Sequence, residues 1–209
     1  MNKKIWIGTL LFLGVALMSF TFLAEEEKEK YPTIENGTEM PKADLKMLDV
    51  SGKELSLNDI KKENGTLVVF SCNTCPFVVM WEDRYDDMEQ IANRLNIGVA
   101  IINSNEAKRD GDDSYGQMLI HAEEQKYLSP YLVDEKSKLA DAFGAKTTPH
   151  IFLFDGDDVL VYQGAIDDNY NDYSEVTEKY IQSAMYSVSN GEEVAISKTD
   201  AKGCSIKRK

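Results

Sequence analysis

Histidine, cysteine and basic residues are all scarce in this chain of 209 residues. It has two histidines and three cysteines, and its 23 Lys and Arg face 36 Asp and Glu, for a formal net charge of −13. Three cysteines are too few for the disulfide framework of a small secreted scaffold. A net charge this negative opposes binding to the phosphate backbone of nucleic acids. We therefore expect no nucleic-acid partner.

The first 24 residues stand apart in composition. Lys3 and Lys4 precede twenty uncharged residues, 5–24, a pattern typical of an export signal. The apolar run is also long enough to cross a bilayer. The cleavage site after Ala24 would be poor, because bulky Phe22 lies two residues before it. Residues 1–24 are therefore either a signal peptide or an N-terminal membrane anchor. Both outcomes place the rest of the chain outside the cytoplasm, periplasmic or otherwise extracytoplasmic.

The remaining residues fit one compact domain with a sizeable core. Residues 25–41 are charged and turn-rich, and we interpret them as a linker that tethers the domain formed by residues 42–209.

Apolar periodicity along 42–209 predicts an α/β domain in which strands and helices alternate before a final hairpin and helix. The expected strands are 45–50, 54–57, 66–70, 97–102, 131–133, 151–154 and 159–162, and the expected helices are 59–62, 77–95, 114–126, 137–143 and 173–189. The first two strands form an N-terminal β-hairpin extension. This order requires a central mixed β-sheet flanked by helices on both faces.

The most informative motif is Cys72-Asn73-Thr74-Cys75, between the strand 66–70 and the helix 77–95. Unpaired backbone N–H groups at a helix start stabilise negative charge, and hence a thiolate. The Cys-x-x-Cys spacing also lets the two thiols close a small ring. This arrangement predicts a dithiol that cycles between reduced and oxidised forms.

The order of elements around this motif resembles the thioredoxin fold, with Thr147-Thr148-Pro149 before a strand as its second mark. The chain from about Met40 to its end is similar to the peroxiredoxin-like redoxins of the AhpC/TSA type. The segments that carry the likeness are 70–78, 100–105, 130–135 and 203–207. Thr74 stands where that group often has histidine, and Arg208 where it tends to have tryptophan.

The resemblance implies that the peptide bond before Pro149 is cis and lies against the dithiol, where the missing N–H leaves a gap for a substrate backbone. It implies an oxidoreductase, and from the dithiol we expect one that acts on protein disulfides or thiols without a cofactor. We expect Cys72 to be the exposed nucleophile and Cys75 to resolve the mixed disulfide. Asn73 and Thr74 supply no imidazolium, so the thiolate must be stabilised by the helix start.

A thiol peroxidase, with peroxide as substrate, is the main alternative. A peroxidatic cysteine resembles Pro-x-x-x-Thr-x-x-Cys, but Cys75 has Cys72 three residues before it and Val68 seven residues before it. The hydroxyl that would orient a peroxide is therefore missing. The arginine that such a site needs would be one of Arg84, Arg94 and Arg109. Thiol–disulfide exchange is thus the favoured chemistry.

Two further alternatives concern the third cysteine. Cys72, Cys75, Cys204 and one histidine could form a four-ligand metal site, although a cis proline over the dithiol would tend to exclude a metal. A redoxin-like domain could also bind a partner without turnover. Cys204 itself is an inert thiol near a frayed end, an auxiliary redox partner or a structural signature of the resembling group.

Side chains outside the motif are given structural roles. We expect His121 on the surface and His150 to be structural, although it follows Pro149. Phe77, Met80 and Trp81 are expected in the core, on the buried face of the helix after the dithiol.

Overall fold

The computed structural model describes residues 30–209. The signal peptide or anchor expected at residues 1–24, and with it the membrane tether, lies outside the described residues. Within residues 30–209, no helix is long and apolar enough to cross a bilayer.

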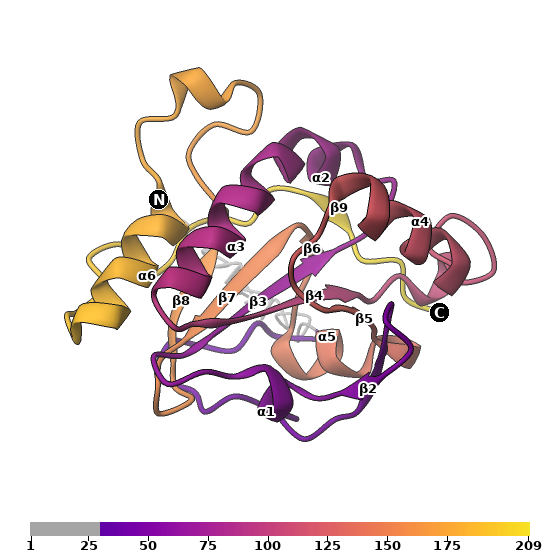
Figure 1. Cartoon of the computed structure of the whole chain (residues 1–209), viewed down its shortest axis with the longest axis horizontal. Coiled ribbons are helices and arrows are strands. Elements are labelled where there is room, and N and C mark those ends of the chain that lie inside the picture. Colours follow the sequence, from indigo (N-terminus) through magenta and orange to yellow (C-terminus); the bar gives the residue numbers. More distant parts are fainter. Residues whose placement is uncertain (1–29) are drawn as a thin grey trace, which may run out of the picture.

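Seven strands form one mixed sheet in the order β2-β1-β5-β4-β3-β7-β8 (Figure 1). Their bounds are β1 Met47–Asp49, β2 Glu54–Leu55, β3 Thr66–Ser71, β4 Gly98–Asn103, β5 Tyr131–Val133, β7 His150–Phe154 and β8 Leu160–Gly164. The central strand β3 runs parallel to β4 and antiparallel to β7, while β1 and β2 pair as the N-terminal hairpin. The predicted thioredoxin-like fold with a central mixed sheet is confirmed.

Helices cover both faces of this sheet, because successive side chains of a strand point to opposite sides. The helices are α1 Leu57–Ile60, α2 Pro76–Trp81, α3 Tyr85–Arg94, α4 Tyr115–Gln125, α5 Lys138–Phe143 and α6 Tyr180–Asn190. Val69 of β3 faces the core formed with α3, α4 and α6. Its neighbours Val68 and Phe70 face the core formed with α1 and α5. The strands β3, β4 and β7 are thus buried on both faces, as their largely apolar sequences require.

The helix expected at 77–95 is broken into α2, a 3₁₀ turn (Glu82–Arg84) and α3. The guanidinium of Arg84 is buried and donates from Nη1 to the carbonyl of Met80, at 2.8 Å. In a continuous helix, the carbonyl of Met80 would instead accept a hydrogen bond from the backbone N–H of Arg84. The expectation that Met80 lies in the core is wrong: it is 43% exposed, whereas Trp81, the next residue of α2, is buried.

The last helix begins at Tyr180 instead of near residue 173, because the segment before it closes on the side chain of Asp168. The backbone N–H of Thr177 donates to Asp168 Oδ1 at 3.0 Å, and the N–H of Asp168 donates to the carbonyl of Glu178 at 3.2 Å. These bonds hold the segment as a loop, so only the residues after Lys179 are free to form α6.

Part of the segment 25–41, expected to be a linker, packs against the domain from about residue 33. The backbone N–H of Ile34 donates to the carbonyl of Phe143, and that of Gly37 to the carbonyl of Leu160. Met40 is buried in the core on the α5 side. The described part of this segment is therefore a structural element of the domain, since its backbone groups are paired with those of the domain.

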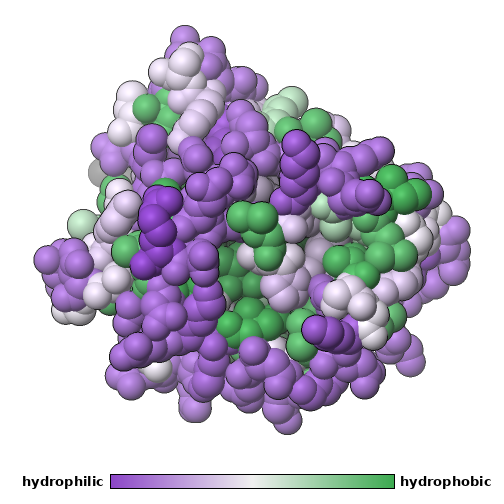
Figure 2. All heavy atoms as spheres, in the orientation of Figure 1, coloured by the Kyte–Doolittle hydropathy of each residue, from purple (hydrophilic) through white to green (hydrophobic). Residues whose placement is uncertain are grey.

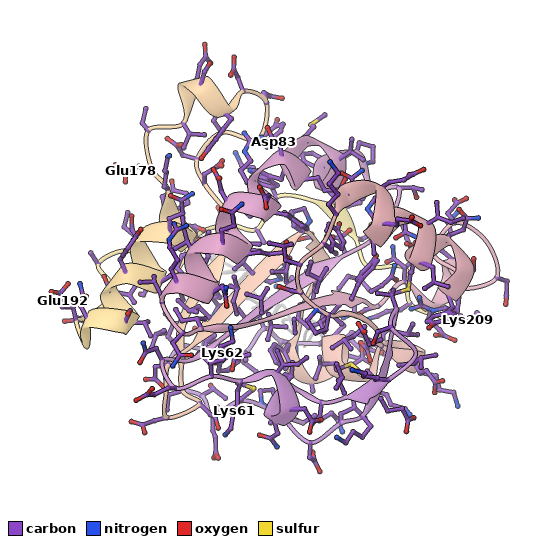
Figure 3. The ribbon with its side chains drawn as sticks, viewed as in Figure 1. Lys61, Lys62, Asp83, Glu178, Glu192 and Lys209 are labelled. Atoms are coloured by element: carbon purple, nitrogen blue, oxygen red, sulfur yellow. The ribbon has the colours of Figure 1, made fainter. Side chains whose placement is uncertain are left out.

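The acidic excess lies on the surface. Figure 3 shows Asp83, Glu178 and Glu192 at the periphery, with side chains that point away from the sheet. Hydrophilic side chains cover most of the same face in Figure 2, and hydrophobic ones gather near its centre. This distribution keeps the charges solvated.

Candidate functional site

The dithiol lies where the central strand β3 ends and α2 begins. Cys72 follows Ser71, the last residue of β3, and Cys75 is the N-cap of α2 with Pro76 in its first turn. Both cysteines are free thiols. Cys72 is 2% exposed and Cys75 is 5% exposed. The prediction that Cys72 is exposed is therefore wrong, because segments distant in the sequence cover the motif.

One of these segments contains Thr148 and Pro149. The peptide bond between them is cis, as the sequence resemblance implies. The hydroxyl oxygen of Thr148 lies 3.2 Å from Cys72 Sγ, and its carbonyl oxygen lies 3.2 Å from Cys75 Sγ. The hydroxyl can donate to a thiolate on Cys72, and the carbonyl can accept the S–H of Cys75. Thr148 therefore contacts both sulfurs, which the sequence motif alone does not show.

A buried carboxylate holds the loop between the two cysteines. Asp113 Oδ1 accepts from the backbone N–H of Asn73 at 2.9 Å and from Asn103 Nδ2 at 2.8 Å. Its other oxygen accepts from Asn105 Nδ2 at 3.0 Å, and the hydroxyl of Tyr131 donates to Asn73 Oδ1 at 2.8 Å. Since every member has a partner, this network positions the loop rigidly. Asp113 escaped prediction because it sits in a polar, acidic stretch that looks solvated in the sequence.

The thiolate is best stabilised on Cys75. A hydrogen bond from Cys72 lowers the pKa of Cys75, and the thiol of Cys204 and the backbone N–H groups of Val78 and Cys204 lower it further, against the opposing effect of burial. The pKa of Cys72 is raised by its hydrogen bond with Cys75 and by burial, and the charge of Asp113 raises it as well. The surroundings thus lower the pKa of Cys75 and raise that of Cys72, and the hydroxyl of Thr148 opposes the rise at Cys72.

The C-terminal segment completes the site. The short strand β9 (Cys204–Ser205) pairs antiparallel with β6 (Thr147–Thr148), and Cys204 is the partner of Thr148 (Figure 1). Cys204 packs against the cluster of Cys72, Cys75 and Val78. The backbone at Cys204 is thus paired and not frayed. The frayed end assumed in the first of the three interpretations of Cys204, an inert thiol, is therefore wrong.

The dithiol opens onto a cavity of about 180 Å³. Its lining comes from the dithiol motif, the loop after β4, β6 and the C-terminal segment: Cys72, Thr74, Cys75, Pro76, Asn105, Lys108, Asp113, Thr148, Cys204, Ser205 and Lys207. All three cysteines of the chain therefore reach one cavity, together with Lys108 and Lys207.

The model of the AhpC/TSA family matches residues 37–163, more than half of the chain. The chain belongs to the AhpC/TSA family. Similar solved structures include a hypothetical protein from Sinorhizobium meliloti 1021, with 29% identity and a TM-score of 0.78 over 85% of this chain and 97% of that one. An uncharacterized conserved protein from Geobacillus kaustophilus has 31% identity and a TM-score of 0.76, over 86% of this chain and 93% of that one.

A peroxidoxin from Mycobacterium tuberculosis shares the fold at 13% identity, with a TM-score of 0.57 over 76% of this chain and 97% of that one. No curated protein was found to match the chain. Membership of the AhpC/TSA family therefore indicates redoxin chemistry without a specific reaction.

The three arginines considered for a peroxidase site lie away from the dithiol cavity of this AhpC/TSA domain. Arg84 is held by Asp167, and Arg109 donates to the backbone carbonyls of Asn103 and Asp113. Arg94 lines a different cavity. None of the three lines the dithiol cavity, where Lys108 and Lys207 are the basic residues present.

The histidines also lie away from the dithiol cavity. His121 was expected on the surface, but its side chain is mostly buried, with Nε2 2.5 Å from Glu82 Oε1. The turn that breaks the α2–α3 helix places Glu82 beneath α4, and this explains the difference. His150 stacks near Phe152, and burial lowers its pKa to about 3, which keeps it neutral. This environment agrees with a structural role.

The three sulfurs come together without a histidine. Within residues 30–209, no group of three or more His, Cys, Asp or Glu side chains is arranged to hold a metal ion. The four-ligand metal site considered from the sequence needs a histidine, and neither histidine lines the cavity.

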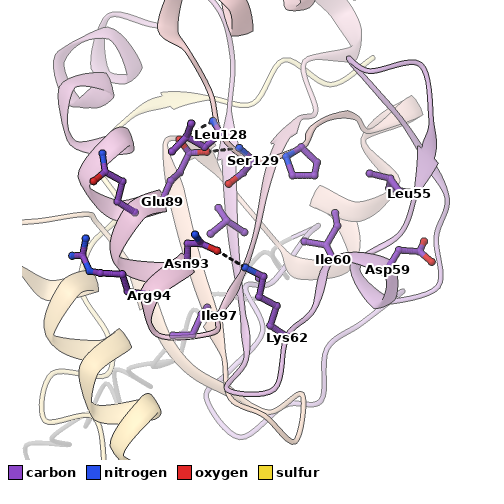
Figure 4. Close-up of a pocket in the computed structure, with 14 residues that line it drawn as sticks. Leu55, Asp59, Ile60, Lys62, Glu89, Asn93, Arg94, Ile97, Leu128 and Ser129 are labelled. Carbon is purple, nitrogen blue, oxygen red and sulfur yellow. Dashed lines mark hydrogen bonds between the residues drawn. The ribbon is translucent and has the colours of Figure 1, made fainter.

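A larger cavity, of about 500 Å³, lies near the opposite end of the parallel strands, beside Gly98 at the start of β4 (Figure 4). Glu89 lines it and accepts hydrogen bonds from the backbone N–H groups of Leu128 and Ser129. Lys62 Nζ donates to Asn93 Oδ1 at 2.9 Å across the same cavity. Its lining contains no cysteine.

Proposed function

We propose that this protein is a thiol–disulfide oxidoreductase that uses Cys72 and Cys75 outside the cytoplasm. The observation that carries the proposal is the pair of free thiols in mutual contact, one of which has a lowered pKa, at a cavity bordered by the cis Thr148-Pro149 segment. Membership of the AhpC/TSA family supports an oxidoreductase. The apolar segment 5–24, which follows two lysines, supports export or an N-terminal anchor.

The charge distribution leads us to assign the first step to Cys75. Its thiolate attacks one sulfur of a partner disulfide, the partner S–S bond breaks, and the departing partner sulfur takes up a proton. Cys72 then loses its proton and attacks Cys75 Sγ, which forms the Cys72–Cys75 disulfide and releases the second partner thiol. Two electrons pass to the partner, and the same steps in reverse oxidise a partner dithiol. This assignment exchanges the roles expected from the sequence.

Thr148 supports both steps of the proposal. Its hydroxyl can stabilise Cys72 as that sulfur becomes a thiolate during resolution, since it lowers the pKa of Cys72. Its carbonyl can take the S–H of Cys75 when that sulfur is protonated. A protein disulfide or thiol is the partner that this chemistry needs, and we expect its sulfur to approach through the dithiol cavity, because the backbone of Thr148 is already paired with that of Cys204.

A peroxidase function is less well supported. A peroxide would also react with a Cys75 thiolate, but no arginine lines the cavity. The residue three positions before Cys75 is Cys72, so no hydroxyl is available there. The hydroxyl of Thr148 contacts Cys72 and not Cys75. Thiol–disulfide exchange needs two thiols and a donor beside them, and Cys72, Cys75 and the hydroxyl of Thr148 supply these groups.

The test compares reduction of insulin disulfides and consumption of hydrogen peroxide by the full chain. Cys72→Ser and Cys75→Ser should each lose roughly 100-fold or more of disulfide reduction, because each removes a reacting sulfur. Met80→Ser, on the exposed side of α2, is the matched control and should retain it. Peroxide consumption without insulin reduction would support the peroxidase instead. Partner capture that survives both cysteine substitutions would indicate a binding domain without turnover.

A further inference from the structure

Cys204 is held at the dithiol by the backbone pairing of the C-terminal segment. Its strand partner is Thr148, whose hydroxyl and carbonyl contact the two sulfurs of the dithiol. Cys204 packs on the cluster of Cys72, Cys75 and Val78, and both its thiol and its backbone N–H approach Cys75 Sγ. Cys75 is thus the central sulfur of three, with Cys72 and Cys204 as its neighbours.

The residues that follow Cys204 anchor the C-terminal segment to the domain. Ile206 is buried, and its N–H donates to the carbonyl of Lys146 at 2.9 Å. The N–H of Lys207 donates to Asn105 Oδ1 at 2.8 Å, and Arg208 Nε donates to Asp141 Oδ1 at 2.7 Å. Such a set of contacts lowers the entropy lost when Cys204 forms a bond with a nearby sulfur.

Gly203 allows this close approach. A Cβ atom at this position would lie 2.2 Å from the carbonyl oxygen of Thr148 and 2.7 Å from its carbonyl carbon. Both are backbone atoms, which cannot rotate away as the end of a flexible side chain can. A residue other than glycine would therefore push the segment away from Thr148 and carry Cys204 away from Cys75.

We propose that Cys204 is a third redox-active thiol, which takes over the disulfide formed by the Cys72–Cys75 pair. Deprotonated Cys204 Sγ attacks Cys75 Sγ, the Cys72–Cys75 bond breaks, a Cys75–Cys204 bond forms, and Cys72 leaves as a thiolate that takes up a proton. One disulfide is exchanged for another, so no further oxidant is consumed. The proposal rests on the proposed function, which supplies the Cys72–Cys75 disulfide.

The local charges support this order of events. While Cys75 is a thiolate, burial and the hydrogen bond with Cys75 raise the pKa of Cys204, which keeps it protonated. Once Cys75 is part of a disulfide its negative charge is gone, and the nearby ammonium group of Lys207, which lowers the pKa of Cys204, meets no opposing charge on Cys75. The effects of Cys75 that raise the pKa of Cys204 are thus removed once the first disulfide has formed, which favours attack by Cys204 at that stage. After the exchange Cys72 is a thiol again, and the disulfide links Cys75 to Cys204 in the C-terminal segment.

The experiment maps disulfides in the full chain. The protein is equilibrated with glutathione redox buffers of stepwise composition, free thiols are blocked with iodoacetamide, and linked peptides are identified by mass spectrometry. Wild type should show both the Cys72–Cys75 and the Cys75–Cys204 linkage. Cys72→Ser should show Cys75–Cys204 as its main intramolecular disulfide. Gly203→Ala should reduce the Cys75–Cys204 share at least about fivefold and leave the Cys72–Cys75 share unchanged, because the Cβ displaces only the C-terminal segment.

Gly116→Ala is the matched control, since a Cβ at Gly116 meets nothing within 4 Å, and it should behave as wild type. Circular dichroism shows that each variant compared is folded. A Cys72–Cys75 disulfide without any Cys75–Cys204 linkage, or Cys204 found only in intermolecular disulfides, would overturn the proposal and leave the proposed function intact. Failure to form the Cys72–Cys75 disulfide in any buffer would instead remove the proposed function.

Discussion

The hydroxyl oxygen of Thr148 lies 3.2 Å from Cys72 Sγ, although 76 positions separate the two residues in the chain. The contact exists because the cis peptide segment before β7 and the loop after β3 meet at the same end of the sheet. It gives the more deeply buried thiol of the pair a donor that can stabilise its charged form.

Thr148→Val removes that donor with little change in shape. The pKa of Cys72 should rise further, because the hydroxyl lowers it in the native protein. Resolution of a mixed disulfide on Cys75 should then slow by about tenfold, the equivalent of one hydrogen bond to a charged group. Stopped-flow kinetics with a fluorescent disulfide substrate measure this step. Thr148→Ser keeps a hydroxyl and should retain most of the rate, and equal losses in both variants would contradict the assignment.

The pH dependence of alkylation should differ between the cysteines. An ordinary thiol loses reactivity about tenfold for each pH unit below its pKa of about 8.5. The pKa of Cys75 is lowered by Cys72, Cys204 and two backbone N–H groups, so its reactivity should stay nearly constant as the pH falls from neutral to about 6. The pKa of Cys72 is raised, so it should react only at alkaline pH.

Residue-resolved iodoacetamide labelling at limiting reagent, read by mass spectrometry, measures both profiles in the reduced protein. A flat profile for Cys72 with a steep one for Cys75 would reverse the assignment of the attacking sulfur.

Asp113→Asn should loosen the dithiol loop. The amide can still accept one hydrogen bond, but its NH₂ group would face the side-chain NH₂ of Asn103 or Asn105, which now donate to the carboxylate. Leaving a buried donor unpaired costs about 1–3 kcal/mol of unfolding free energy, measured by urea denaturation of the reduced protein. Loss of the negative charge should also lower the pKa of Cys72, visible in its alkylation profile. Asp112→Asn is the matched neighbour, because Asn73 bonds the backbone carbonyl there, and it should change little.

Asp167→Ala should destabilise the protein strongly. Asp167 is buried and accepts hydrogen bonds from Trp81 Nε1 at 3.0 Å and from Arg84 Nε at 3.2 Å. Removal leaves the buried guanidinium with only the carboxylate of Asp83, which is largely exposed, and leaves Trp81 Nε1 without its acceptor, which together cost on the order of 3 kcal/mol. Urea denaturation measures the change. An exposed carboxylate of the same loop gives the control: Glu175→Ala should have a much smaller effect, and equal effects would show that the ion pair contributes little.

Local sequence determined a large part of this fold. The apolar runs at 66–70 and 97–102 became the central strands β3 and β4, because a run without polar residues can only be stable when both faces are covered. The cis bond at Pro149 followed from a resemblance that covers the motif and its strand. The break between α2 and α3 could not be predicted, because Asp167, which accepts a hydrogen bond from Arg84, comes from a loop 83 positions later in the chain.

The sequence by itself determined that two thiols two residues apart follow a buried strand and begin a helix, and that a proline motif precedes another strand. Only the tertiary structure decided what surrounds each sulfur, because the donors and charges come from Asp113, Thr148 and Cys204, which are distant in the chain. It also decided the place of Cys204. Spacing along a chain says nothing about a residue more than a hundred positions away, whereas one backbone pairing with Thr148 holds it at the dithiol.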